Sequence, residues 1–291
     1  MQTIPRRAFC RAAFALAVTR AYGAGAVSAR MPVGFISHGP QIPTPAERVT
    51  ELHAWGETLP KPRGVLVMTP HFGSRKLGLG PTGRGVAWYS FPSSIKRRLP
   101  PHLEYPTPPS EGLARRVEQL LAGVEPIDRR TKPGFEHTTW MPLLYLLPQA
   151  DVPVLELTYP YRTDAEIFQL GARFAPLRDE GILLLASGTM THNLAVTNLG
   201  SVAEPSSVLP WGREFDLWAK ERLLAQDVDS LLDWRRKAPS AELAHPDDGG
   251  HFRVLLFVLG AVLGNGGRAS YVRFPVEGFE SGQPKRCVEM A

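Results

Sequence analysis

Residues 64–71 read GVLVMTPH, a charge-free apolar run that ends at a proline and a histidine. An uninterrupted run of this length, rich in aliphatic side chains, is typical of a strand that is buried on both faces of a sheet. Residues 33–37 form a similar run, which is followed directly by His38. The two stretches therefore predict buried strands at 33–37 and 64–69, each followed closely by an imidazole group.

Short apolar runs alternate with longer helical patterns through the rest of the chain. Further strands are predicted at 152–158, 182–186 and 269–274, and helices at 45–59, 111–122, 164–177, 211–225, 229–237 and 251–263. This alternation predicts an α/β fold with a central, mostly parallel or mixed sheet and helices on both of its faces. Because no shift in composition marks a linker, we expect residues 31–291 to form a single domain.

The surplus of positive charge belongs to the first thirty residues. The chain has 33 Lys and Arg against 28 Asp and Glu, and residues 1–30 hold five arginines and no acidic residue. The remaining basic residues therefore equal the acidic ones in number. Binding to a phosphate backbone depends on a net basic surface, so nucleic acid is not an expected partner.

Residues 1–30 have two interpretations. Arg6-Arg7 ahead of a short apolar stretch at 12–18 resembles a twin-arginine signal peptide, which predicts export to the periplasm. That stretch is too short to span a bilayer, so no membrane span is expected. Alternatively, translation starts at Met31 and the protein stays in the cytoplasm.

Histidines are the candidate metal ligands, because Cys287 is the only cysteine after residue 30. His38 directly follows its predicted strand, and His71 follows the strand predicted at 64–69 after Pro70. His192 lies six residues beyond the end of the strand predicted at 182–186. The carboxyl ends of strands in an open α/β sheet converge on one edge, where ligands bind. His245 and His251 add two imidazoles ahead of a late helix. Neutral imidazoles bind iron, zinc, copper and nickel, so a metal site without thiolates is predicted.

Several short motifs follow one another along the body of the chain. They are FISHG at 35–39, PH at 70–71, EHTTWMPL at 136–143, DVPV at 151–154, SGTMTHNL at 187–194 and HP at 245–246, before His251. In this order and spacing they resemble the class III extradiol ring-cleaving dioxygenase superfamily, particularly its 4,5-DOPA extradiol dioxygenase branch. The resemblance spans nearly all of residues 31–291, which it identifies as an extradiol dioxygenase-like catalytic domain.

The resemblance implies a divalent metal, iron(II) or sometimes zinc, bound by His38, His71 and His251. It places His192 beside the metal as the acid/base group or as a fourth ligand, and it places His137 against the substrate. The implied reaction opens a catechol-type aromatic diol with O2. An imidazole suits proton transfer near neutral pH, because its unperturbed pKa is about 6.5.

Three features depart from the pattern of the superfamily. Its Asp-His-Gly-x-Trp motif has a longer acid here, Glu136, and Thr138 replaces the glycine. The spacing between His245 and His251 is one residue longer, so His245 stays open as an alternative metal ligand or as a substrate-binding residue.

Two other functions stay open at the level of sequence. A zinc-dependent hydrolase could use the same histidines, with a metal-bound hydroxide as nucleophile. A non-catalytic member of the superfamily could bind a metal or a peptide in the same cleft, because a fold does not determine a function. The sequence is also compatible with assembly into a homo-oligomer, but it does not determine the oligomeric state.

Overall fold

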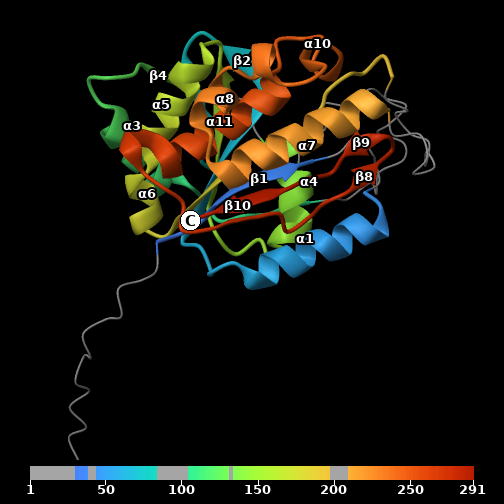
Figure 1. The fold of residues 1–291 in the computed structure, drawn as a ribbon. Coiled ribbons are helices and arrows are strands. Elements are labelled where there is room, and N and C mark those ends of the chain that lie inside the picture. Colours follow the sequence, from blue (N-terminus) through green and yellow to red (C-terminus); the bar gives the residue numbers. More distant parts are fainter. Residues whose placement is uncertain (1–29, 39–43, 84–103, 131–133, 197–208) are drawn as a thin grey trace, which may run out of the picture.

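The computed structural model describes residues 30–38, 44–83, 104–130, 134–196 and 209–291 (Figure 1). Within these ranges, the strands of the main sheet are β1 (Val33–Ser37), β2 (Gly64–Ser74), β3 (Leu77–Leu79), β4 (Ile127–Arg129), β5 (Val154–Pro160), β6 (Ile182–Gly188), β7 (Val272–Arg273) and β10 (Val288–Met290). Their order across the sheet is β4-β3-β5-β2-β6-β1-β10-β7. A separate two-stranded ribbon pairs β8 (Phe279–Glu280) with β9 (Gln283–Pro284).

The centre of the sheet is parallel and its flanks are mixed. Neighbouring strands run parallel from β5 through β2 and β6 to β1. In contrast, β3 is antiparallel to β5, and β10 is antiparallel to both β1 and β7. The predicted α/β fold with a mostly parallel or mixed sheet is therefore confirmed.

The central strands are apolar because both of their faces are covered. In β2, Leu66 and Met68 belong to one hydrophobic core, whereas Val65 and Val67 belong to the other. This division follows from the period of two in a strand, in which successive side chains point to opposite faces. Burial of both faces explains the uninterrupted run that the sequence shows at this place.

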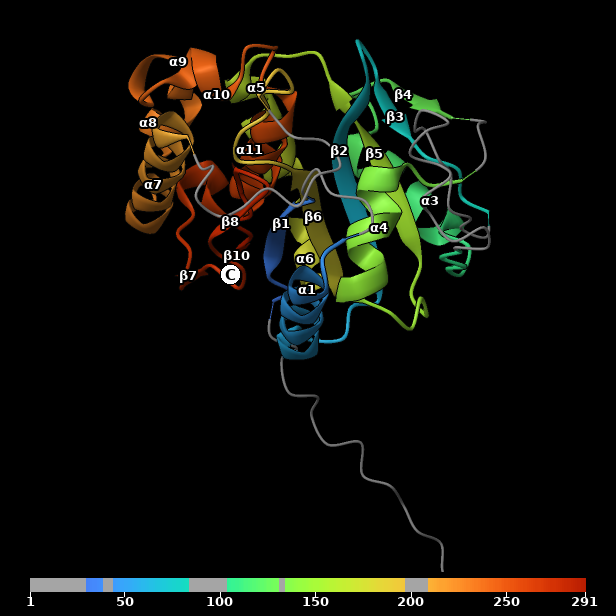
Figure 2. The ribbon, with the colours of Figure 1, turned by 90° about the vertical axis from the view of Figure 1, so that its right-hand side faces the viewer.

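Two layers of helices cover the sheet, with one layer on each face. The longer helices are α1 (Ala46–Thr58), α3 (Glu111–Leu121), α4 (His137–Leu146), α5 (Asp164–Phe174), α7 (Pro210–Ala225) and α11 (Gly250–Leu263). In Figure 1, α1 and α4 lie below the sheet, and α7 and α11 lie above it. Figure 2 shows the same arrangement from the side. Helix α11 is apolar around nearly its whole circumference because it is enclosed between the sheet and the outer helices.

Some elements differ from the prediction. The helix predicted at 229–237 is two short helices, α8 (Val228–Leu232) and α9 (Trp234–Lys237), because Asp233 between them has non-helical dihedrals. Helix α4 and strand β10 were not predicted. Strand β10 carries a buried acid, Glu289. The indole N–H of Trp55 donates to Glu289 Oε2 at 2.6 Å, and this hydrogen bond offsets the cost of burying the carboxylate.

The remaining helices in the described ranges are short. They are α6 (Pro176–Asp179), α10 (Ala241–Ala244) and the 3-10 turn η2 (Gly264–Gly266). No helix of the described residues is long and apolar enough to cross a membrane. The two interpretations of residues 1–30 remain predictions, because residues 1–29 lie outside the described ranges.

Candidate active site

Five histidines from separate elements gather at the carboxyl edge of the sheet. His38 follows β1, His71 lies near the end of β2, His137 begins α4, His192 follows β6, and His251 lies in the first turn of α11. The ring centroids of His71 and His251 are 5.2 Å apart, and those of His38 and His251 are 5.4 Å apart. His137 lies 5.0 Å from His71, and His192 stacks on His251 at 3.6 Å. The convergence predicted from the strand ends is therefore present.

Gly188 at the end of β6 allows the strands and α11 to meet at the site. Its carbonyl oxygen accepts a hydrogen bond of 2.9 Å from the backbone N–H of His38, and the next residue, Thr189, donates to the carbonyl oxygen of His251 at 3.0 Å. A Cβ atom on Gly188 would lie 2.0 Å from that His251 oxygen. Only glycine permits this close approach of backbone to backbone.

The strand that carries His71 is longer than predicted. β2 continues past His71 to Ser74, and its pairing with β5 shifts register between Thr69 and Ser74. Pro70 lies in this irregular part and cannot donate a ladder hydrogen bond. His71 therefore lies in an irregular strand end rather than in the loop that follows it.

Two of the rings have the spacing of a pair of metal ligands. Nε2 of His71 and Nε2 of His251 are 3.3 Å apart. Two imidazole nitrogens at about 2.0 to 2.1 Å from one tetrahedral ion are themselves about 3.3 Å apart. Nδ1 of His38 lies 3.2 Å from Ser187 Oγ, so Nε2 is the nitrogen of His38 available to an ion.

The protonation of these rings also suits a metal. Burial lowers the pKa of His38 well below its usual range, and the nearby ring of His71 lowers it further. Burial likewise lowers the pKa of His251, and the rings of His192 and His38 add to that shift. Both rings are therefore neutral at pH 7, which is the form that binds a cation. The donor set fits a divalent ion that accepts nitrogen ligands.

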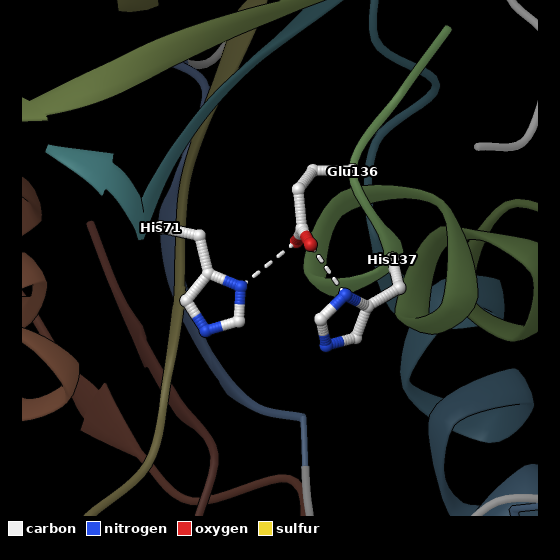
Figure 3. A group of neighbouring side chains, drawn as sticks. All are labelled: His71, Glu136 and His137. Atoms are coloured by element: carbon white, nitrogen blue, oxygen red, sulfur yellow. Dashed lines mark ion pairs between the residues drawn. The ribbon is translucent and has the colours of Figure 1, made fainter. Parts of the chain in front are cut away.

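A buried carboxylate, Glu136, joins two of the histidines. Nδ1 of His71 lies 3.2 Å from Glu136 Oε2, and Nδ1 of His137 binds Glu136 Oε1 (Figure 3). Glu136 is the N-cap of α4, and its Oε2 also accepts from the backbone N–H of Thr138 at 2.9 Å. Burial by itself raises the pKa of Glu136, but the hydrogen bonds from His137 and His71 outweigh it and hold the pKa well below its usual range. From the sequence, Glu136 was noted only as a departure from the superfamily motif, and no role was predicted for it. An acidic residue just before a helix is typical of an N-cap, and this pattern could have indicated its position.

A second buried acid supports the first. Glu156 lies on β5, and its Oε1 accepts a hydrogen bond of 2.7 Å from the backbone N–H of Glu136. Burial raises the pKa of Glu156 to about 7. No pattern in the sequence distinguishes this residue, because a single acid inside an apolar strand also fits an exposed position.

Asp247 forms the corresponding pair with His192. Nδ1 of His192 lies 2.6 Å from Asp247 Oδ2, and Asp247 Oδ1 accepts from the backbone N–H of Gly249 at 2.8 Å. Burial opposes ionisation of Asp247, but the hydrogen bond with His192 outweighs it and leaves the pKa lowered. Sequence reasoning missed this residue, although an aspartate two residues before a glycine is typical of a turn that such a side chain closes.

His245 is not brought into the cluster. Its Nε2 bonds the carbonyl oxygen of Met190 at 2.9 Å, and its ring packs against Phe215, Trp234 and Phe252. Burial lowers the pKa of His245 to about 4, so the ring is neutral. The geometry therefore favours His251 over His245 as a metal ligand, because the Nε2 of His245 is already bound to the backbone of the core.

Comparison with known proteins gives concordant results. Residues 34–278 match the family described as the catalytic LigB subunit of aromatic ring-opening dioxygenase. A 4,5-DOPA dioxygenase extradiol of Beta vulgaris is 32% identical over 78% of this chain and 85% of its own length. Another of the same name from Escherichia coli is 30% identical over 88% of this chain and 92% of its own length.

A solved structure shares the fold. The crystal structure of an uncharacterized protein from Escherichia coli K12 superposes with a TM-score of 0.72 and 30% sequence identity, covering 90% of this chain and all of that one. The family match, these relatives and the histidine cluster agree with one another. The chain belongs to the LigB family of extradiol ring-cleavage dioxygenases, in the branch of the 4,5-DOPA dioxygenases.

Proposed function

We propose that this protein is an iron(II)-dependent extradiol dioxygenase that opens a catechol-type aromatic ring with O2. The observation that carries the proposal is the convergence of imidazoles, with Nε2 of His71 and Nε2 of His251 3.3 Å apart. Membership of the family supplies the reaction class, and the donor set supports the choice of cofactor. Imidazole ligands also suit zinc, so the metal is the first point to test.

His38, His71 and His251 would hold the ion. The chemistry that bound iron(II) supplies is electron exchange between an aromatic diol and O2. The three rings come from β1 and β2, which lie on either side of β6 in the sheet, and from α11. The backbone contacts at Gly188 fix β1 and α11 relative to each other. A site built on strands and helices holds its ligands more precisely than a site built on loops.

His192 is the proposed acid/base group. Asp247 holds its Nδ1, so a neutral ring presents an unprotonated Nε2 that can accept the proton of a diol hydroxyl and later return it. Because the ring stacks on His251 at 3.6 Å, Nε2 remains near the proposed ligands. A fourth ligand position is the alternative role for His192. His137, on the other side of His71, is proposed to orient a substrate hydroxyl.

The experiment is reconstitution with iron(II) under anaerobic conditions, followed by addition of O2 and a panel of catechols. The relatives are named for DOPA, so DOPA is the first catechol to test. We expect oxygen uptake and a yellow ring-opened product only when iron(II) and a catechol are both present. The zinc-loaded protein is the matched control. Ester hydrolysis by that form, with no oxygen uptake by the iron form, would support a zinc hydrolase instead.

We also propose export to the periplasm through the paired arginines Arg6-Arg7. The test is fractionation of cells that produce the chain or its Arg6→Lys/Arg7→Lys variant. Export predicts that the chain accumulates in the periplasm and that the variant does not. Recovery of both proteins in the cytoplasm, with Met31 as the first residue, would support the alternative start.

A further inference from the structure

One carboxylate, Glu136, contacts both a proposed ligand and the proposed substrate-facing histidine. We propose that Glu136 is a positioning residue that holds His71 and His137 in the same tautomer, with the proton on Nδ1 and an unprotonated Nε2 directed into the site. The inference rests on the proposed function for the roles of the two rings. It adds a residue that couples them and a definite hydrogen-bonding role for each ring nitrogen.

The contacts of the carboxylate determine the tautomers. Nδ1 of His71 lies 3.2 Å from Oε2, and Nδ1 of His137 binds Oε1. An ionised carboxylate can only accept hydrogen bonds, so each of these nitrogens must donate. In a neutral imidazole the second nitrogen is then unprotonated. Figure 3 shows that the second nitrogen of each ring points away from Glu136.

The position of the carboxylate is itself well determined. Its side chain is only 1% exposed, and Oε2 accepts from both the backbone N–H and the hydroxyl of Thr138, at 2.9 and 2.7 Å. The backbone N–H of Glu136 is held by Glu156 at 2.7 Å. The positive end of the α4 dipole further favours a negative charge at this N-cap. Side chain and main chain are thus fixed from opposite directions.

The arrangement has a consequence for substrate binding. With its proton directed to Glu136, His137 offers Nε2 as an acceptor, so it would take a hydrogen bond from a substrate hydroxyl rather than donate one to an oxygen anion. His71 offers its own Nε2 at 3.3 Å from that of His251, where an ion fits. Because both rings bind the same carboxylate, a shift of one is transmitted to the other.

The test begins with zinc(II) titration of the metal-free protein. In Glu136→Gln the side-chain oxygen can accept from one ring, while its amide group donates towards the other. Loss of such an outer hydrogen bond commonly weakens metal binding by about 10- to 100-fold, and we expect this for Glu136→Gln. Glu289→Gln is the matched control, because it makes the same change in a buried acid whose partners, Trp55, Tyr271 and Arg273, lie outside the histidine cluster. It should bind zinc(II) as the unmodified protein does.

Nitrogen-15 NMR of the histidine rings gives a readout that is independent of metal and activity. We expect the Nδ1–H form for His71 and His137 in the metal-free protein, and a change of tautomer for at least one of them in Glu136→Gln. Glu136→Asp retains the charge but withdraws it by about 1.5 Å, so it should lose one ring contact and give an intermediate result. It also keeps the test valid if the Gln variant does not fold.

Unchanged tautomers in both Glu136 variants, together with wild-type zinc(II) affinity, would overturn the proposal. An equal loss of affinity in Glu289→Gln would also overturn it, because the effect would then be general. The ligand assignment is judged separately by His71→Ala. If that variant binds zinc(II) as tightly as the unmodified protein, the proposed metal site is wrong, whereas the ring spectra still decide the role of Glu136.

Discussion

The two carboxylates that hold histidines at this site differ sharply in their surroundings. Glu136 lies at the start of a helix with its side chain 1% exposed, whereas Asp247 lies in a loop with its side chain 37% exposed. Glu136 accepts hydrogen bonds from two rings and from the hydroxyl and backbone N–H of Thr138. Asp247 accepts from one ring and from the backbone N–H of Gly249.

This difference matches the proposed roles of the two histidines, with His71 as a metal ligand and His192 as the acid/base group. A buried charge is stable only when several donors satisfy it, and the same donors restrict its movement. The Glu136 side of the site, which consists of Glu136, His71 and His137, therefore suits a permanent ligand geometry. A partly exposed carboxylate can exchange hydrogen bonds with water. The Asp247 side of the site, which consists of Asp247 and His192, therefore suits a histidine that takes up and releases protons.

The largest expected effect comes from the ligand on the Glu136 side. In His71→Ala we expect iron content close to background and no ring cleavage at any pH, because one of three ligand nitrogens is lost. Metal analysis and oxygen uptake on the same sample provide the measurement. A variant that retains one iron per chain would remove His71 from the ligand set.

His192→Ala should affect turnover far more than iron content. Positioned acid/base groups commonly contribute about 10²- to 10⁴-fold, and we expect a loss of turnover in that range with iron retained. Metal analysis in parallel with His71→Ala decides the result. If iron is lost as completely as in His71→Ala, His192 is a direct ligand, and the base must be sought in His137 or His245.

Asp247→Asn should have a smaller effect than removal of His192, since the imidazole remains in place. Removing the partner of a functional histidine commonly costs about 10- to 100-fold, and we expect the loss at the lower end of that range, in kcat rather than in KM. Steady-state kinetics with the iron content measured on the same sample test this. A loss of iron instead of kcat would show that the two sides of the site do not differ.

Glu156→Gln should change how stability depends on pH. The folded pKa of Glu156, about 7, lies above its ordinary value of 4.5. The folded protein therefore binds a proton more tightly, so this contribution to stability is complete below pH 4.5 and is lost as pH rises through 7. One pKa unit corresponds to 1.36 kcal/mol, so the loss approaches about 3 kcal/mol. Urea unfolding between pH 5 and 8 should give a flatter profile for the variant; parallel profiles would contradict the assignment.

The smallest effect is expected from deletion of residues 1–30, which contribute none of the histidines or carboxylates on either side. Met31 is 4% exposed, and its backbone N–H donates to Arg178 at 3.1 Å. The described contacts that are lost include the Arg30–Asp179 ion pair, and an exposed pair is worth about 0 to 1 kcal/mol. Melting temperature and metal content should stay nearly the same. Loss of solubility or metal would show that residues 1–30 belong to the fold.

Local pattern was sufficient for the main features of the fold. The strand at 33–37 was predicted with its observed bounds, and the first six residues of β2 were predicted as well. Both are apolar runs whose burial on two faces leaves a signal in consecutive residues. The histidines at strand ends could be recognised for the same reason. In contrast, α4 has Pro142 inside it and is buried around most of its surface, so it lacks an amphipathic period.

The contrast between His245 and His251 shows what only the tertiary structure decided. The two rings have the same chemistry and lie six residues apart, so the sequence determined that an imidazole would be present but not which one would face the site. The ring of His245 packs against Phe215 in the core, whereas the backbone of His251 lies close to Gly188 at the site. These two contacts decide which imidazole faces the site. Glu136 and Asp247 likewise gained their roles from partners 65 and 55 residues away, His71 and His192. Such contacts depend on how distant elements pack, and a pattern of neighbouring residues carries no record of that.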